Sequence, residues 1–512
     1  MVTLDRDAAS RWYLLETTRA YGREKLEDRG EVRQAARRHA EFCLTIVAPF
    51  GTEGRLQAAL DDLQRYRVEV DNLRAALNWA FSSSGDAALG VGIAATTTDF
   101  WTAASLVPEA RYWAGKALAR IGDAAGTRHE MVLRYSFGAS SLLTSGMNDR
   151  ARDALTRALA LAREFADFDY QQRATYYLWL FWYRASALDD ALALARRFEE
   201  VPGFGDAQSR AVVDFLVGLT QVYRGAHREA IERVRRATDQ YPAESRRRDM
   251  TRFAFGLSPT AASQIAISFL SRGLLDTAAR LAADAVELAR GTDAPVMLCV
   301  TLAWAAGFVF PSLGDLELAG RYGEELIENA SRHALGPFLA LGLCVRGGVA
   351  TERGDPEGGI ELLHRGLTGM RDARYLLYYP VFQVRRAAAL GAVGRIDEGL
   401  AEIDAALGFA AETGNRLFVP ETWRVKGQLL AGCDPDDPAV EGCFHRGVEV
   451  AREQDALFWE FRLALSMARS RITQNRHGEA RQILAPVYDR FTEGFETADL
   501  LAARAMLDRP PP

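Results

Sequence analysis

The chain has 512 residues, of which 48% are hydrophobic and 25% charged, and its formal net charge is −6. This composition is that of a folded protein, and the small net charge excludes a generally basic nucleic-acid-binding protein. The length excludes a single ordinary compact core. The five cysteines include no Cys-x-x-Cys pair, and the first residues form no apolar targeting stretch, so we expect a reduced, cytoplasmic protein.

Residues 1–82 contain helical patterns that do not repeat further along the chain. Apolar residues recur at helical spacing in residues 12–26, with charged residues between them, and again in residues 37–42 and 70–80. Such patterns predict amphipathic helices that bury one face against another element. We therefore expect residues 1–82 to form a separate N-terminal helical segment.

A turn signature recurs along the rest of the chain with a period of about 40 residues. Gly314, Gly354 and Gly394 each precede a new helical pattern and lie 40 residues apart. Successive steps in this phase are 39 to 41 residues, except for one of 48 in which residues 241–249 predict an exposed loop. The ten turn markers are Ser105, Gly146, Ser186, Gly225, Gly273, Gly314, Gly354, Gly394, Asp434 and Asn475.

Small residues at fixed distances from the markers support this phase. All ten residues five positions after a marker are Ala or Gly, as are six of ten at twelve positions after and eight of ten at seven positions before. The first two sets lie two helical turns apart on one face, so small side chains there let two helices cross closely.

This spacing resembles the tetratricopeptide repeat, with a longer unit. We predict an all-α fold: a tetratricopeptide-like α-solenoid, a right-handed superhelix of about ten helix pairs over residues 83–495. A C-terminal cap helix and a Pro-rich tail should follow in residues 496–512.

One segment is apolar enough to require a membrane check. Residues 295–314 carry no charge, and a membrane-spanning helix needs roughly 20 apolar residues. The segment nevertheless contains Gly307 and Pro311, and Asp293 and Asp315 flank it. Because it also fits the repeat phase, we expect a buried solenoid helix and no membrane span.

Both ends of the chain resemble one family. Residues 12–26 read Trp-Tyr-Leu-Leu-Glu-Thr-Thr-Arg-Ala-Tyr-Gly-Arg-Glu-Lys-Leu, and Arg-His-Ala and Asp-Asn-Leu-Arg-Ala-Ala-Leu follow at 38–40 and 71–77. These stretches resemble the end of the ATPase module in bacterial winged-helix, signal-transduction (STAND-type) ATPase transcriptional regulators, before their tetratricopeptide-like C-terminal half. Residues 484–488 and the stretch Phe-Thr-Glu-Gly-Phe-Glu-Thr-Ala-Asp-Leu at 491–500 are similar to that family's C-terminal signature.

The resemblance implies a sensor or protein-interaction arm. In such a regulator the superhelix groove would bind a peptide, a protein or a small inducer and regulate the winged-helix and ATPase module. The alternative is a stand-alone tetratricopeptide adaptor with no nucleotide-linked partner. The chain has no Gly-x-x-x-x-Gly-Lys-[Ser/Thr] phosphate loop, so we assign no ATP, no other cofactor and no direct nucleic-acid contact to its residues.

Catalytic and metal patterns are incomplete, and we expect neither an enzyme nor a metal site. His129 and Glu130 lack the second histidine of a zinc protease helix, and no Gly-x-Ser-x-Gly elbow is present. One polar turn holds residues that bind metals elsewhere, but at a spacing looser than zinc pairs: Cys433, Asp434, Asp436, Asp437, Cys443 and His445. Acidic residues interleave the arginines at 233–236 and 246–248, which predicts an ion-paired surface.

The ligand groove can be mapped by analogy. In tetratricopeptide arrays the first helix of each pair lines the inner groove, where aromatic and arginine side chains are frequent binding anchors. Carrying that geometry over, six residues are candidate ligand contacts: Arg173, Tyr176, Tyr183, Trp304, Arg462 and Arg469.

Overall fold

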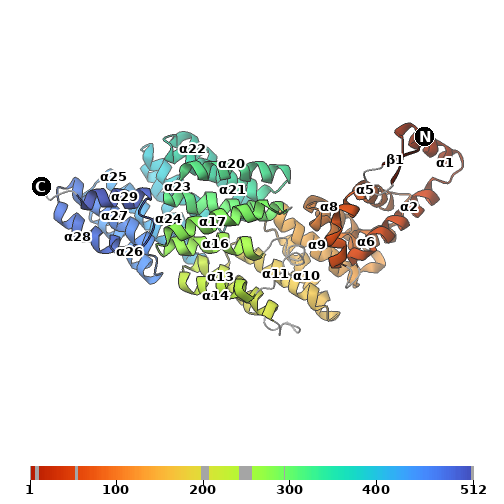
Figure 1. Ribbon diagram of the computed structural model, residues 1–512, viewed down its shortest axis with the longest axis horizontal. Helices are drawn as coiled ribbons and strands as arrows, with labels where there is room; N and C mark the ends of the chain where they lie inside the picture. Colours follow the sequence, from red (N-terminus) through yellow and green to blue (C-terminus); the bar gives the residue numbers. More distant parts are fainter. Residues whose placement is uncertain are drawn as a thin grey trace. The chain divides into compact units, whose positions relative to one another are not determined.

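The structure is a computed structural model that describes residues 2–5, 11–51, 56–197, 207–240, 257–292 and 294–508 (Figure 1). Contacts divide the chain into two compact units, Met1–Phe137 and Gly138–Pro512, and the division falls inside helix α9 (Arg128–Thr144). The domain boundary expected at residue 82 stays a prediction. The predicted loop at 241–249, the arginines at 246–248 and the tail at 509–512 lie outside the described residues.

The first unit begins with a two-stranded antiparallel hairpin. Strands β1 (Val2–Asp5) and β2 (Arg11–Leu14) pair so that Val2 lies opposite Leu14. The helix predicted from residue 12 is therefore wrong over its first turn, because the aromatic residues there favour a strand once a partner strand is present. Helix α1 (Glu16–Asp28) begins after the hairpin and buries none of its residues.

Short helices complete the first unit. A cluster around Leu73, Leu77, Phe100 and Trp101 forms its core, and the Trp101 indole donates a hydrogen bond of 2.9 Å to the Thr97 hydroxyl. The elements are α2 (Val32–Val47), η1 (Ala48–Gly51), α3 (Leu56–Asp61), α4 (Leu63–Arg67), α5 (Val70–Ala80), α6 (Ala87–Thr96), α7 (Thr98–Ala103), α8 (Val107–Leu118) and η2 (Gly122–Ala124).

The second unit is the tetratricopeptide-like array that the repeat phase predicts. Each helix contacts the next one along the chain, and we call the first helix of each pair the A helix and the second the B helix. The A helices are α9, α11 (Phe168–Arg184), α13 (Ala207–Arg224), α16 (Leu257–Ser271), α18 (Pro295–Trp304) continued by η5 (Ala305–Val309) and α19 (Phe310–Leu313), α21 (Gly336–Glu352), α23 (Tyr379–Ala392), α25 (Val419–Cys433) and α27 (Leu457–Thr473).

The B helices alternate with the A helices, and one more helix ends the array. They are α10 (Asp149–Glu164), α12 (Leu188–Arg197), α14 (His227–Gln240), α17 (Leu275–Arg290), α20 (Leu316–Arg332), α22 (Pro356–Asp372), α24 (Ile396–Thr413), α26 (Pro438–Glu453) and α28 (His477–Tyr488), followed by α29 (Ala498–Leu507).

Each turn marker follows a helix, α7 for Ser105 and an A helix for the others, and most of the markers are in the left-handed conformation. Nine of the ten have a positive φ, from 59° at Asn475 to 93° at Gly354. Such a residue terminates a helix and redirects the chain into the next one. Asp434 is the exception, with φ −144°, and α26 begins four residues after it. The expected small contact at Ala439 is accordingly exposed, and Val440 is buried instead.

A second series of left-handed residues, which the sequence did not reveal, marks the turns between repeats. It recurs at nearly the same period, and four of its six members are not glycine, asparagine or serine: Ala166, Ala334, Arg374, Gly414, Asp455 and Gly494. Residues of this kind rarely adopt a positive φ, so their side chains give no turn signal.

The predicted close crossing of A and B helices is confirmed. A Cβ built on Gly359 of α22 would lie 2.8 Å from the Gly347 carbonyl oxygen of α21. A Cβ on Gly366 would lie 2.4 Å from the Cys344 sulfur. Both distances are shorter than a side-chain contact, so only glycine permits this approach of the two helices.

The long apolar segment is an interior A helix, as predicted. Pro295–Leu313 is long and apolar enough to cross a membrane, but 78% of its apolar window is buried inside the array. Its middle, Ala305–Val309, forms a π-helical turn just before Pro311. Proline lacks an amide hydrogen and clashes with the preceding turn of a regular helix, which accounts for the local widening.

The two series of turns meet and close the array on itself. The Met147 amide donates a hydrogen bond of 2.7 Å to the Ala373 carbonyl oxygen. The Leu376 and Leu377 amides donate hydrogen bonds of 2.7 and 3.0 Å to the carbonyl oxygen of Arg184. One repeat further on, two amides donate to the Tyr223 carbonyl oxygen. We call this line of contacts the closure seam.

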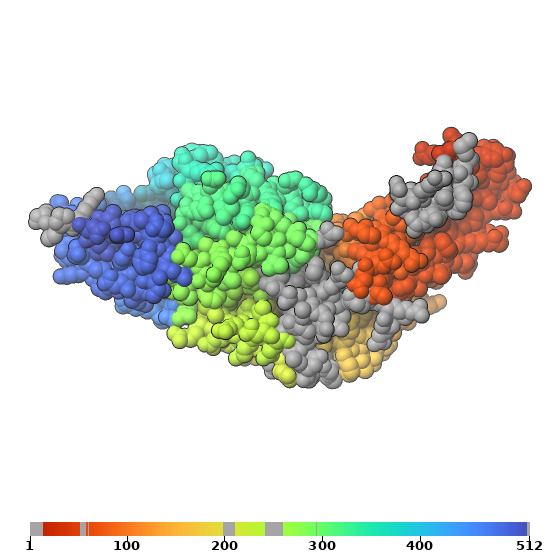
Figure 2. All heavy atoms as spheres, viewed as in Figure 1, coloured from red at the N-terminus to blue at the C-terminus, as the bar shows by residue number. Residues whose placement is uncertain are grey.

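Side chains extend the closure seam towards the C-terminus. The Asn415 side-chain amide donates a hydrogen bond of 3.1 Å to the Ser186 hydroxyl, although the two residues are 229 positions apart in the sequence. The Trp459 indole of α27 donates a hydrogen bond of 3.2 Å to the Ser271 hydroxyl of α16, so these helices are in contact. In the space-filling view the blue C-terminal repeats lie directly against the yellow-green ones (Figure 2). Because repeats far apart in sequence touch, the inner face of the array is largely enclosed.

Candidate functional site: the inner face of the array

Aromatic side chains fill the middle of the inner face. Tyr176, Tyr183 and Trp304 are 1%, 3% and 1% exposed. The Tyr183 ring contacts Tyr223 at 5.4 Å between centroids, and the Trp304 ring lies 5.4 Å from Tyr223 and 4.7 Å from Tyr378. These residues come from helices on both sides of the closure seam, and together they form an interior aromatic column.

Burial controls the ionisation of the tyrosines in this column. It raises the pKa of Tyr183, Tyr223 and Tyr378 well above the usual value for tyrosine, so these phenols stay neutral. The Tyr183 hydroxyl donates a hydrogen bond of 2.7 Å to the Gln264 side-chain oxygen. The column is buried in this structure, and the ligand role expected of Tyr176, Tyr183 and Trp304 stays a prediction.

Arg173 is also interior, whereas the two C-terminal candidates are not. Arg173 is buried and lies 2.7 Å from Asp169, one helical turn before it on α11. Arg462 is partly exposed and Arg469 is exposed, and both belong to α27. The six residues expected to line one groove are therefore divided between an enclosed region and an accessible one.

The sequence missed Arg184, whose backbone lies in the closure seam. Its side chain is 3% exposed, with the guanidinium carbon 5.4 Å from the Phe338 ring and 5.1 Å from the Tyr375 ring. Within the described residues no carboxylate pairs with it, and its Nη1 has no hydrogen-bond acceptor. Nothing in the local sequence Trp-Tyr-Arg-Ala-Ser separates this arginine from a surface one.

A second group of polar and charged side chains, all buried or partly buried, lies on α23, α25, α27 and α29. Glu421 is buried and accepts two hydrogen bonds of 2.7 Å from Arg424 and one of 2.8 Å from Arg462. Arg462 also lies 3.1 Å from Asp499. We call this the inner charge cluster, and its members are Arg385, Glu421, Arg424, Arg462, Ser466 and Asp499.

Electrostatics keep the inner charge cluster ionised. Burial opposes ionisation of Glu421, but the charges of Arg424 and Arg462 outweigh it and hold the pKa of that carboxyl below its usual value. Burial lowers the pKa of Arg385 to about 10, against the attraction of Glu352 and Glu421. Arg385 and Arg424 are thus cationic at neutral pH.

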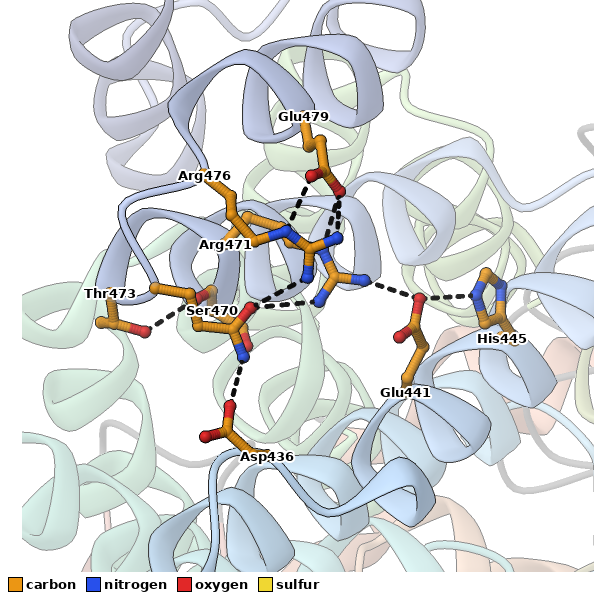
Figure 3. A network of polar contacts seen from close by, with 9 residues as sticks. Asp436, Glu441, His445, Ser470, Arg471, Thr473, Arg476 and Glu479 are labelled. Carbon is orange, nitrogen blue, oxygen red and sulfur yellow. Dashed lines mark hydrogen bonds and ion pairs between the residues drawn. The ribbon is translucent and has the colours of Figure 1, made fainter. Parts of the chain in front are cut away.

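A separate surface pocket of about 240 Å³ is lined by residues of α26 and α27 and of the turns beside them. Its polar side chains form a network (Figure 3): Arg471 donates a hydrogen bond of 2.6 Å to Glu441, Arg476 donates one of 2.7 Å to Glu479, and the Gln474 amide donates one of 2.9 Å to Asp436. Arg471 and Arg476 are each paired with a carboxylate. The pocket has no unpaired cation and does not favour an anion.

This pocket contains the polar turn that the sequence analysis weighed as a metal site. Asp437 accepts a hydrogen bond of 2.8 Å from the Ala439 amide and caps α26. Cys443 is buried while Cys433 is exposed, so the two thiols do not face one space. Across the described ranges, no three His, Cys, Asp or Glu side chains converge as metal ligands.

The arginines expected to form an ion-paired surface do so in their described part. Arg233 and Arg236 each lie 2.9 Å from Asp214, and Arg233 is 2.7 Å from Glu229. The interleaved charges neutralise one another, so this surface offers no phosphate-binding patch among the described residues.

Comparisons with known proteins link part of the chain to transcriptional regulators. No known family profile matches the chain. A segment of 178 residues, 33% of the chain, is 30% identical to a protein named as an HTH-type transcriptional regulator in Mycobacterium tuberculosis, and it matches the Mycobacterium bovis counterpart equally well. An uncharacterised protein of Rhizobium meliloti is 24% identical over 142 residues. The chain spans about a fifth or less of the length of these relatives, 19% and 14%.

Solved structures share the helical-repeat fold. A Rap protein complexed with competence and sporulation factor aligns with a TM-score of 0.50 at 11% identity, over 74% of this chain and 98% of that protein. A STAND protein with a tetratricopeptide repeat sensor from Pyrococcus horikoshii aligns at 0.35 and 10% identity, over 68% of this chain and 55% of its own. At these identities the likeness concerns the fold alone.

Proposed function

We propose that this chain is the sensor and protein-interaction arm of a bacterial ATPase-type transcriptional regulator. One observation carries the proposal: a third of the chain is 30% identical to proteins named as HTH-type transcriptional regulators. The tetratricopeptide-like fold supports it, because such arrays act as binding scaffolds rather than as catalysts. The ATPase and DNA-binding activities of the regulator belong to the proposal, since the match covers 19% of the relatives.

The closure seam supplies the two-state element that a sensor needs. It encloses tyrosine hydroxyls and the unpaired cation of Arg184, and buried groups of this kind make a closed form less stable than an apolar interface would. A ligand that binds the open array more tightly than the closed one shifts the population towards the open form. In this mechanism the interior aromatic column becomes a ligand surface only after opening.

The N-terminal helical segment is the proposed contact with the ATPase module, which its sequence resembles at the junction. Five large apolar side chains among its described residues are exposed, and three of them are Leu15 at 43%, Tyr21 at 60% and Phe42 at 62%. Exposed apolar side chains gathered in one segment are typical of a protein-interaction surface.

Reconstitution in the source bacterium tests the proposal. The tagged chain is recovered with its bound proteins, the ATPase-bearing partner is purified, and its ATP turnover is measured with and without the chain. We expect a severalfold change in turnover. Unchanged turnover, or recovery of partners without any ATPase module, would instead favour the stand-alone adaptor.

Variants sharpen this experiment. Replacing Leu15, Tyr21 and Phe42 together by serine should abolish the change in turnover without lowering the melting temperature, because these side chains are exposed. Leu288→Ser is the matched control, since Leu288 is an exposed leucine of α17 in the other unit. An equal loss in the control would mean that the effect is not specific to the N-terminal segment.

A further inference from the structure

A further surface pocket lies in the first unit, where it is lined by residues of α5 and α8 (Figure 1). Its volume is about 380 Å³. Small-molecule sites have volumes of about 300–1,000 Å³ and combine an aromatic or apolar wall with a few polar groups that orient the ligand. The residues that line this pocket are Arg74, Asn78, Pro108, Glu109, Tyr112 and Trp113.

The aromatic wall of the pocket is open to solvent at Tyr112. This side chain is 52% exposed, although the neighbouring Trp113 is buried. The two rings meet edge to face with their centroids 4.7 Å apart, and the Lys116 ammonium lies 5.0 Å from the Tyr112 centroid. These contacts hold the tyrosine ring in place while much of it stays in water, so a planar ligand would be stabilised by covering it.

Polar groups of the lining are left without partners among the described residues. The Trp113 side chain is 4% exposed, and its indole N–H has no hydrogen-bond acceptor. Because a buried donor without an acceptor is unfavourable, an acceptor on a ligand is favoured at this wall. The Asn78 side chain is exposed and makes no hydrogen bond. Its amide offers both a donor and an acceptor, which match the N–H and the carbonyl oxygen of another amide group.

The charges of the lining cancel. Arg74 and Glu109 are the charged residues that line the pocket, and Arg74 of α5 donates a hydrogen bond to Glu109 of α8. Arg74 also donates a hydrogen bond of 3.1 Å to Asp71. Each charge of the lining therefore has its counter-charge, and an ionised ligand would lose its hydration without gaining a new ion pair. The lining favours an uncharged ligand.

We propose that this pocket binds a small uncharged ligand that carries a carboxamide or lactam group on a planar ring. The ring covers Tyr112, and the amide group bonds to the Trp113 indole N–H and the Asn78 side chain. The site goes beyond the proposed function, because it lies in the first unit and the groove residues expected from the sequence lie in the second.

The test is a ligand-detected NMR titration of the purified full chain with three matched probes. Benzamide is uncharged and planar, benzoate has the same shape with a negative charge, and cyclohexanecarboxamide keeps the amide without the planar ring. We expect saturable binding of benzamide at about millimolar concentration and severalfold weaker binding of the other two. Absence of saturable benzamide binding would overturn the proposal, and so would equally tight binding of either other probe.

Substitutions locate the binding within the chain. Asn78→Ala and Tyr112→Ala change exposed side chains, so both variants should keep the melting temperature. Each should weaken benzamide binding about two- to tenfold, as expected for the loss of one hydrogen bond or one ring contact. Trp113→Phe should weaken it within the same range, because the aromatic wall remains without its N–H donor.

Phe168→Ala is the matched control, since Phe168 is an exposed aromatic residue of α11 in the second unit. It should leave the affinity for benzamide unchanged. Equal weakening in Phe168→Ala and Tyr112→Ala would overturn the site and indicate general attraction to exposed rings. Full binding by both Asn78→Ala and Tyr112→Ala would also overturn it.

The result is independent of the fate of the proposed function. If ATP turnover of the recovered partner responds to the chain but benzamide does not bind, the pocket proposal is wrong and the sensor arm stands. If benzamide binds through Asn78 and Tyr112 but no ATPase partner responds, the ligand site stands without the sensor arm.

Discussion

A substitution at Gly146 tests the closure seam directly. Gly146 has φ +85°, and a Cβ placed on it would lie 2.1 Å from the Ala373 carbonyl oxygen. Gly354 occupies the same position in its own repeat with φ +93°, but a Cβ there meets nothing within 4 Å. The two alanine variants therefore share the local cost of a left-handed backbone, about 1–2 kcal/mol, and differ in the seam contact alone.

The additional cost in Gly146→Ala follows from one hydrogen bond. To relieve the clash, the two turns must separate, and the Met147 amide then loses its 2.7 Å bond to the Ala373 carbonyl oxygen. Leaving such buried groups unpaired costs about 1–3 kcal/mol. Since 1.4 kcal/mol corresponds to a factor of ten, local opening of the seam should become about five- to a hundredfold more frequent.

Hydrogen exchange followed by mass spectrometry is the appropriate assay, because long repeat arrays do not always unfold in two states. Peptides containing the amides of Met147, Leu376 and Leu377 should exchange faster in Gly146→Ala by that factor. In Gly354→Ala the same peptides should keep their protection. Equal exchange of the seam peptides in the two variants would refute the closure seam as a stabilising contact.

Three further predictions follow from the same interior. Arg184→Met should leave the melting temperature unchanged or raise it, because a buried unpaired cation costs several kcal/mol and its aromatic contacts return about 0.5–2 kcal/mol; a calorimetric fall of several degrees would contradict this. Asn415→Ala should destabilise the array by about 1–3 kcal/mol in urea, since it removes buried hydrogen bonds of 3.1 and 3.0 Å to Ser186 and the Leu377 carbonyl oxygen. Glu421→Gln should flatten the loss of stability in acid: the folded-state pKa of Glu421 lies below its ordinary 4.5, so its contribution is present above pH 4.5 and disappears as the pH falls through the folded-state value. Melting temperatures of both proteins across this range check the last prediction, and parallel curves would contradict it.

The sequence predicted the fold because the decisive contacts are local. Turn residues and small residues recur at a fixed period, and each serves a crossing of two adjacent helices, as at Gly347 and Gly359. A periodic signal of this kind requires only that neighbouring elements pack in the same way in each repeat. The strand at Arg11–Leu14 lay outside the repeat and lacked this support.

The site was only partly predictable, because it depends on contacts between distant repeats. The ligand role of Arg462 stays a prediction, and the analogy with an open groove gave no reason to expect that Tyr176 and Trp304 would be enclosed. Enclosure depends on how far the array curves, and the curvature accumulates from small angles between helices that no single residue encodes. Arg184 was missed for a related reason: the Phe338 and Tyr375 rings that surround its guanidinium belong to distant repeats.

The turn glycines show how a local requirement conceals a long-range one. A positive φ alone favours glycine at a turn marker, so the sequence does not distinguish the role of Gly146 from that of Gly354. In three dimensions they differ, because only the first approaches a turn from a distant repeat. Ser186 shows the complementary case: it accepts the left-handed conformation and uses its hydroxyl to receive the Asn415 amide, a bond that glycine would lack. A seam residue such as Ser186 must therefore both adopt the left-handed conformation and make a contact with a distant repeat. A double-mutant cycle at Ser186 and Asn415 measures the energy of the contact separately from the cost of the backbone conformation.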